Sequence, residues 1–109
     1  MSSKGESAFQ TKVLKFMGSI GLLALRYDAS APGHLEGFPD IIVFNNVDAP
    51  LGDWTHFFLE LKDFGGSCQS NQKLVAELIS PFGATYVCST PREIEELVLK
   101  LTGTKKKLK

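Results

Sequence analysis

Two apolar segments joined by a turn constrain the fold of this chain more than any other feature. DIIVF (residues 40–44) and THFFLELK (residues 55–62) are rich in β-branched and aromatic residues, as buried strands are. The segment between them, NNVDAPLGDW, concentrates Asn, Asp, Gly and Pro, which favour turns. We predict an antiparallel hairpin with its turn centred near residue 50, so that paired residue numbers sum to about 100 and Asp40 lies opposite Glu60.

The second segment ends in two charged residues, Glu60 and Lys62, which a buried strand would not ordinarily accept. Residues two apart in a strand share a face, so these two side chains lie on one side. Asp40 adds a second carboxylate, with its Cβ atom roughly 5 Å from that of Glu60. A divalent cation with oxygen ligands would compensate both carboxylates, whereas Lys62 alone compensates only half of their charge. The alternative is that Glu60 and Lys62 face solvent on a half-buried strand.

Periodicity and turn residues predict the remaining elements. These are helices at 6–20 and 91–102, a helix capped by Ser67 or Ser70 and ended by Pro81 and Gly83, and strands at 21–27, 40–44, 55–62 and 84–89. The order is α-β-β-β-α-β-α, which predicts an α/β fold with a mixed sheet of about four strands flanked by helices. We expect a single domain over residues 1–103 and a frayed, basic C-terminal tail over residues 104–109.

The chain has 12 basic residues (Lys and Arg) and 12 acidic residues (Asp and Glu), but they are unevenly distributed along it. Residues 27–63 carry seven acids and one base, whereas each flanking segment carries a net charge of +3. An acidic centre between basic flanks suits a metal site presented to a polyanion, and a solvated acidic hairpin loop explains it equally well. No apolar run is long enough to span a membrane, no signal peptide is evident, and Cys68 and Cys88 lack metal-ligand spacing. We therefore expect a cytoplasmic protein with reduced thiols and no membrane contact.

Four short motifs, taken together, resemble a nuclease family. GFPDIIVF followed by FFLELKDFGGSCQSNQ resembles the PD-(D/E)xK signature, with Pro39-Asp40 and Glu60-Leu61-Lys62 as its two parts. More narrowly, the chain resembles the VRR-NUC domain, whose pattern is a helical Glu, G-x-P-D, E-x-K and a Gln on the next helix. The matching residues are Glu6, Gly37-Phe38-Pro39-Asp40, Glu60-Leu61-Lys62 and Gln72. The resemblance covers essentially the whole chain and implies a restriction-endonuclease-like core.

A metal site of defined composition follows from this resemblance. It implies that Asp40, Glu60 and the carbonyl of Leu61 bind Mg²⁺ or Mn²⁺, and that Glu6 adds a ligand directly or through water. Such a metal lowers the pKa of a bound water and stabilises charge on the scissile phosphate. A second interpretation of Glu6 stays open, because Ser3 and Glu6 have the spacing of a capping box at the start of the first helix.

The resemblance also implies roles for two residues that do not bind the metal. Lys62 would orient the attacking water and stabilise the transition state, and Gln72 would position substrate or water. An ordinary exposed helix position remains an alternative for Gln72. His34 and His56 lack partners at zinc spacing, so a direct role for either is less favoured.

The implied activity is phosphodiester hydrolysis by a structure-selective DNA endonuclease. Small stand-alone members of the family, common in phages and prophages, resemble Holliday-junction resolvases, which implies a four-way junction as substrate and a homodimer. The apolar surface of the first helix or of the first strand is the expected dimer interface. The alternatives are a nuclease for flaps or single-strand ends and a non-catalytic DNA-binding module. Further candidates for contacts with the DNA backbone are Arg26, Tyr27, Ser67 and the lysines of the tail.

Overall fold

The computed structural model describes residues 4–27, 37–62 and 70–108, and leaves aside the side chains of residues 4–7 and 71. The chain forms three α-helices and four strands in the predicted order, with a short 3-10 helix as the one addition. The elements are α1 (Lys4–Ser19), β1 (Leu23–Arg26), β2 (Ile41–Phe44), β3 (His56–Leu61), α2 (Ser70–Ile79), η1 (Ser80–Phe82), β4 (Thr85–Cys88) and α3 (Pro91–Thr102). The α/β class predicted from the sequence is therefore confirmed.

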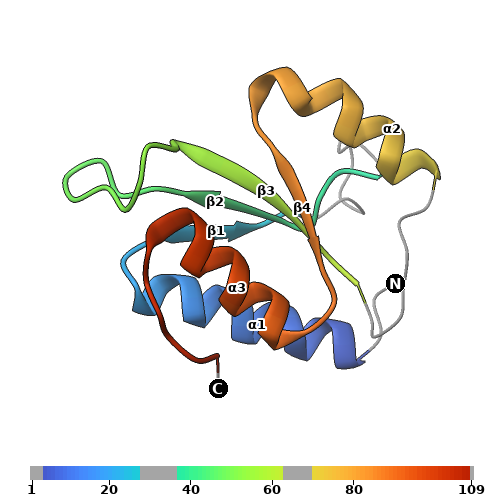
Figure 1. Cartoon of the computed structure of the whole chain (residues 1–109). Coiled ribbons are helices and arrows are strands. Elements are labelled where there is room, and N and C mark those ends of the chain that lie inside the picture. The colour runs from blue at the N-terminus through green and yellow to red at the C-terminus, as the bar shows by residue number, and fades with distance from the viewer. Residues whose placement is uncertain (1–3, 28–36, 63–69, 109) are drawn as a thin grey trace.

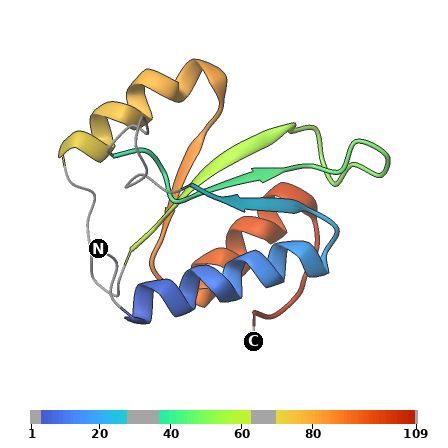
Figure 2. The ribbon, with the colours of Figure 1, turned by 180° about the vertical axis from the view of Figure 1, so that it is seen from behind.

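The four strands form one mixed sheet in the order β1-β2-β3-β4. β1 and β3 both pair antiparallel with β2, and β3 pairs parallel with β4 after a crossover through α2. Helices α1 and α3 lie on one side of the sheet, and α2 lies on the other side (Figures 1 and 2). We call the side covered by α1 and α3 the inner face and the opposite side the outer face.

The hairpin of β2 and β3 has the predicted register. Ile41 pairs with Leu59 and Phe44 pairs with His56, so the paired residue numbers sum to 100. Extending this ladder by one residue sets Asp40 opposite Glu60. The loop that joins the strands is fixed by Asn45, whose side-chain amide donates to the Trp54 carbonyl at 2.8 Å. The hairpin and its loop therefore set the register that places Asp40 opposite Glu60.

The inner face is the hydrophobic core. Alternate strand residues point into it, because side chains two apart share a face. From the strands it receives Ile41, Val43, Phe57, Leu59 and Leu61, and from the helices Val13, Phe16, Met17, Ile94, Leu97 and Val98. The apolar stripe of α1 is thus buried in the core, and its expected role as a dimer interface stays a prediction.

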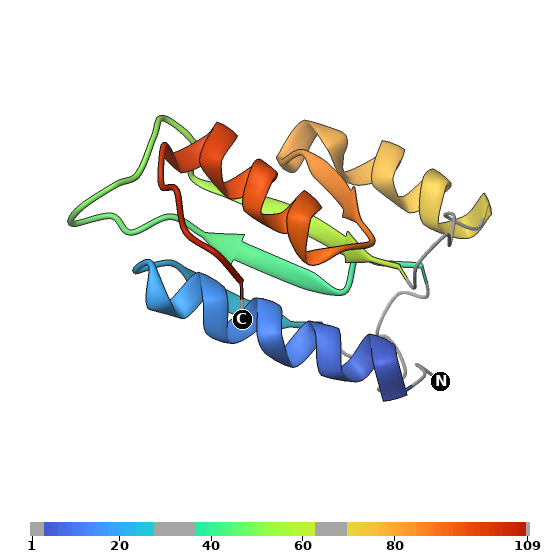
Figure 3. The same ribbon diagram turned by 60° about the horizontal axis from the view of Figure 1, so that its bottom comes forward.

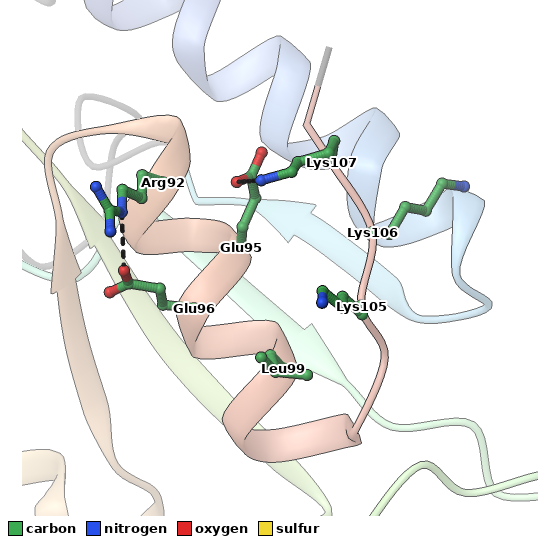
Figure 4. A pocket seen from close by; sticks show the side chains of 7 residues that line it. All are labelled: Arg92, Glu95, Glu96, Leu99, Lys105, Lys106 and Lys107. Atoms are coloured by element: carbon green, nitrogen blue, oxygen red, sulfur yellow. Dashed lines mark hydrogen bonds and ion pairs between the residues drawn. The ribbon is translucent and has the colours of Figure 1, made fainter.

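The C-terminal tail follows α3 back along the inner side of the molecule. The Lys106 ammonium donates to the Ser19 hydroxyl at 2.9 Å, and the Leu108 amide donates to the Glu95 carboxylate at 2.8 Å. The tail and α3 line a pocket together (Figure 4). The expectation of a frayed tail is therefore wrong for residues 104–108, because tertiary contacts with α1 and α3 hold them.

Two further findings concern the whole fold. Figure 3 shows that α1, α3 and the tail share one side of the molecule. Within the part of the chain that the structure describes, no helix combines the length and the apolar character that a membrane span requires.

Candidate active site

Three of the predicted site residues lie on the outer face, at the end of the sheet where β2 begins and β3 finishes. Ile41, Leu59 and Leu61 point into the core, so Asp40, Glu60 and Lys62 alternate to the other side. Glu60 is only 3% exposed. A carboxylate that is buried to this extent requires compensation by hydrogen bonds or by a cation.

Asp40 is held against β3 by a hydrogen bond. The amide N–H of Leu61 donates to its Oδ2 at 2.9 Å. A carboxylate has about four lone-pair sites, so this bond leaves Asp40 able to bind a cation as well. The bond also explains why Asp40 stays beside Glu60 although the strand pairing itself begins one residue later, at Ile41.

Pro39 gives the carbonyl of Leu61 an unusual environment. The amide of Asn45 donates to the carbonyl of Thr55 at 2.9 Å, so this pair belongs to the hydrogen-bonded type, and such pairs recur every second residue. The ladder itself ends at Ile41 and Leu59, so Pro39 and Leu61 occupy the next position of this type beyond it, where the Leu61 amide donates to the Asp40 side chain instead. Proline has no N–H to donate, so the Leu61 carbonyl lacks the ladder donor that another residue would supply. A carbonyl oxygen in this position is well suited to a cation.

Lys62 is oriented by α2. Its ammonium donates to Oε1 of Gln72 at 2.5 Å, which links the end of β3 to the first turn of α2. The backbone of Lys62 also continues the sheet, because its N–H donates to the carbonyl of Cys88 at 3.0 Å. The sequence placed Gln72 on the next helix, and the structure brings it to the predicted lysine.

The aromatic residues around Asp40 were not recognised from the sequence as part of the site. Phe38 lies between Tyr27 and Phe58, with ring centroids 4.4 Å and 5.5 Å away. Phe58 is on the same face of β3 as Glu60, so these rings fix the segment that leads into Asp40. The signal in the sequence was the pair of phenylalanines, each located two residues before a carboxylate.

Several other predicted residues lie elsewhere or have structural partners. His56 is at the opposite end of β3 and packs its ring against Phe44 and Phe58, at 6.0 Å and 5.7 Å. The guanidinium of Arg26 donates to the hydroxyl of Thr11 at 3.3 Å. Lys105, Lys106 and Lys107 line a pocket together with α3, on the inner side of the sheet (Figure 4).

Some predictions fall outside the described residues. His34, Ser67 and Cys68 are among them, and so is the side chain of Glu6, whose backbone belongs to the first turn of α1. The choice between metal ligand and helix cap for Glu6 stays a prediction.

The donors at this site fit a hard cation. Among the side chains that the structure describes, no group of three or more His, Cys, Asp or Glu residues is placed to hold a metal ion. Two carboxylates, Asp40 and Glu60, and one backbone carbonyl, Leu61, nevertheless form an oxygen-only donor set of the kind that Mg²⁺ and Mn²⁺ prefer. Comparison with known proteins found no matching family model, no matching characterised protein and no matching solved structure.

Proposed function

We propose that this protein is a metal-dependent DNA endonuclease of the PD-(D/E)xK type, with a VRR-NUC-like domain. The observation that carries the proposal is the bond from the Leu61 amide to Asp40, at 2.9 Å. This bond holds a second carboxylate beside the buried Glu60, on the face to which Lys62 also points. Two carboxylates and an ammonium at one sheet end are the groups that hydrolysis of a phosphodiester requires.

Asp40, Glu60 and the Leu61 carbonyl would hold Mg²⁺ or Mn²⁺, with Glu6 as a further ligand. When bound, the metal lowers the pKa of a coordinated water and offsets negative charge on the phosphate. Carboxylate and carbonyl oxygens are the ligands that such a cation prefers.

Lys62 would act on the phosphate side of the metal. An ammonium has three N–H donors, and the bond to Gln72 uses one of them. In this proposal the other two orient the attacking water and stabilise the charge that develops on the phosphate oxygens. Gln72 acts as a positioning residue in this scheme, since it fixes the direction in which the ammonium points.

The proposed substrate is branched DNA, with a four-way junction as the first candidate and a homodimer as the active form. A domain of 109 residues has little surface for reading a long base sequence, which favours recognition of shape. A junction has two strands to cut, and a two-fold dimer supplies two equivalent sites. Flaps and single-strand ends are the second candidate. A cytoplasmic location and a phage or prophage origin belong to the same proposal.

The test is cleavage of a labelled four-way junction with Mg²⁺ or Mn²⁺. We expect Asp40→Asn to lower the cleavage rate at least about 1000-fold, while its amide oxygen still accepts the Leu61 N–H and preserves the fold. Asp53→Asn, at an exposed acid of the hairpin loop, is the matched control and should cut normally. Junction binding without cleavage under either metal would refute the enzyme and leave the DNA-binding module. Equal cutting of linear duplex would remove the preference for branched DNA.

A further inference from the structure

The outward side of α2 exposes large apolar residues. Leu74 and Leu78 are 57% and 62% exposed and lie four residues apart, so they form a ridge on one side of the helix. Phe82, in η1 directly after α2, is 72% exposed. Val75, by contrast, is buried. The helix is therefore amphipathic in sequence, yet part of its apolar surface is not used by the fold of one chain.

Two opposite charges border this ridge. Lys73 and Glu77 are both exposed and form the adjacent row, also four residues apart. A surface with leucines in one row and a lysine and a glutamate in the next is complementary to itself when a second copy is turned by 180°.

We propose that α2 is the self-association surface of this protein, through an antiparallel contact with α2 of a second copy. A two-fold axis near Ala76 sets Leu74 against Leu78 of the second copy, and the reverse pair forms by symmetry. The same axis brings Lys73 within reach of Glu77 of the second copy, again twice. One short helix and its copy thus form two apolar contacts and two ion pairs, each between a lysine of one copy and a glutamate of the other.

The outer surface of β1 is the competing interface. Leu23 and Leu25 are 57% and 49% exposed there. The charged neighbour of these leucines is Arg26, which donates to Thr11 within the same chain and has no acid beside it on the strand. Self-complementarity of charge therefore favours α2 over β1, and variants of β1 provide the control.

This contact would have a consequence for the site, which rests on the proposed function. Gln72, which holds Lys62, lies one helical turn before Ala76. The two Gln72 residues of a dimer, and the two lysines that they orient, would therefore be related by the two-fold axis, each on the side of α2 that faces its own sheet. Paired sites of this kind suit cuts in two strands, and association itself is measured without DNA.

The experiment is sedimentation of the full chain over a range of concentrations. We expect the wild-type protein to dimerise, and Leu78→Glu, Lys73→Glu and Glu77→Lys each to weaken the dimer at least about tenfold. Leu25→Glu should leave it unchanged. Circular dichroism establishes that each variant folds, which is expected because all four positions are exposed.

Mixing the two charge variants is the decisive step. In a mixture of Lys73→Glu and Glu77→Lys, every contact across the axis joins a glutamate to a lysine, so a heterodimer should form with about wild-type affinity. Charges within each helix are unchanged by mixing, so restored association reports only on the contact between copies. A monomeric wild-type protein, a mixture that does not associate, or a dimer lost in Leu25→Glu alone would overturn the proposal. Metal-dependent cleavage by a monomer would overturn this inference and leave the proposed nuclease standing.

Discussion

Adjacent residues of β3 lie in different environments, because their side chains point to opposite faces of the sheet. Leu59 and Leu61 point to the inner face and are fully buried among side chains of α1 and α3. Glu60, between them, is almost equally buried, yet it lies on the outer face opposite Asp40. Burial alone therefore does not distinguish core from site. What distinguishes them is whether the buried atoms are apolar, as in Leu59 and Leu61, or carry a formal charge, as in Glu60.

This difference predicts that stability and activity separate along β3. A buried methyl group stabilises the fold wherever it is, because it is removed from water. A buried carboxylate opposes folding unless it is compensated. Substitutions on the inner face should therefore weaken the fold, and substitutions at the carboxylates should abolish activity without weakening it.

The largest expected effect is that of Glu60→Gln on cleavage. Glutamine keeps the shape of the side chain but loses the charge that would bind the metal, so we expect the cleavage rate to fall at least about 1000-fold. In EDTA, thermal unfolding should show a melting temperature close to that of the wild type, because glutamine keeps the volume of the buried side chain. A variant that melts lower and still cuts DNA would show that Glu60 stabilises the fold and does not serve catalysis. The proposed separation of stability and activity along β3 would then be wrong.

Next in size is the effect of Leu59→Ala on stability. Leu59 is 0% exposed in the core, and truncation of such a leucine lowers the free energy of unfolding by about 3 kcal/mol through lost burial and a cavity. Chemical denaturation measures this value. The cleavage rate per folded molecule should stay within about twofold, since Leu59 points away from Asp40 and Glu60. A loss of cleavage similar to that of Glu60→Gln in a fully folded sample would show that the faces are not independent.

The sequence was sufficient for the hairpin and insufficient for contacts between distant elements. Turn residues around position 50 and two apolar segments determined the register, which is why Asp40 could be set opposite Glu60 in advance. The start of α3 is equally local, since Thr90 and Glu93, three residues apart, form a capping box. Local signals of this kind depend on residues only a few positions apart.

Contacts of α2 and of the tail could not be predicted in this way. The bond from Lys62 to Gln72 depends on how the crossover through α2 returns to the sheet, which no short pattern specifies. Periodicity marked Leu74 and Leu78 as apolar positions of a helix, but only the fold shows that they are exposed. The tail was expected to fray because of its lysines, yet Glu95 accepts the amide of Leu108.

The smallest expected effect concerns Cys88, a titratable group on the inner face. Burial, and next the negative charge of Glu93, raise the pKa of this thiol from 9.0 to about 12. An unfolded chain loses this proton from about pH 9, whereas the folded protein retains it to about pH 12, so the contribution of Cys88 to the free energy of unfolding should be constant below pH 9 and fall above it. Denaturation at pH 8 and pH 10 should show a smaller loss for Cys88→Ala than for the wild type. Equal losses would mean that the core accommodates the thiolate of Cys88. The difference between an apolar inner face and a charged outer face would then not hold at the end of β4.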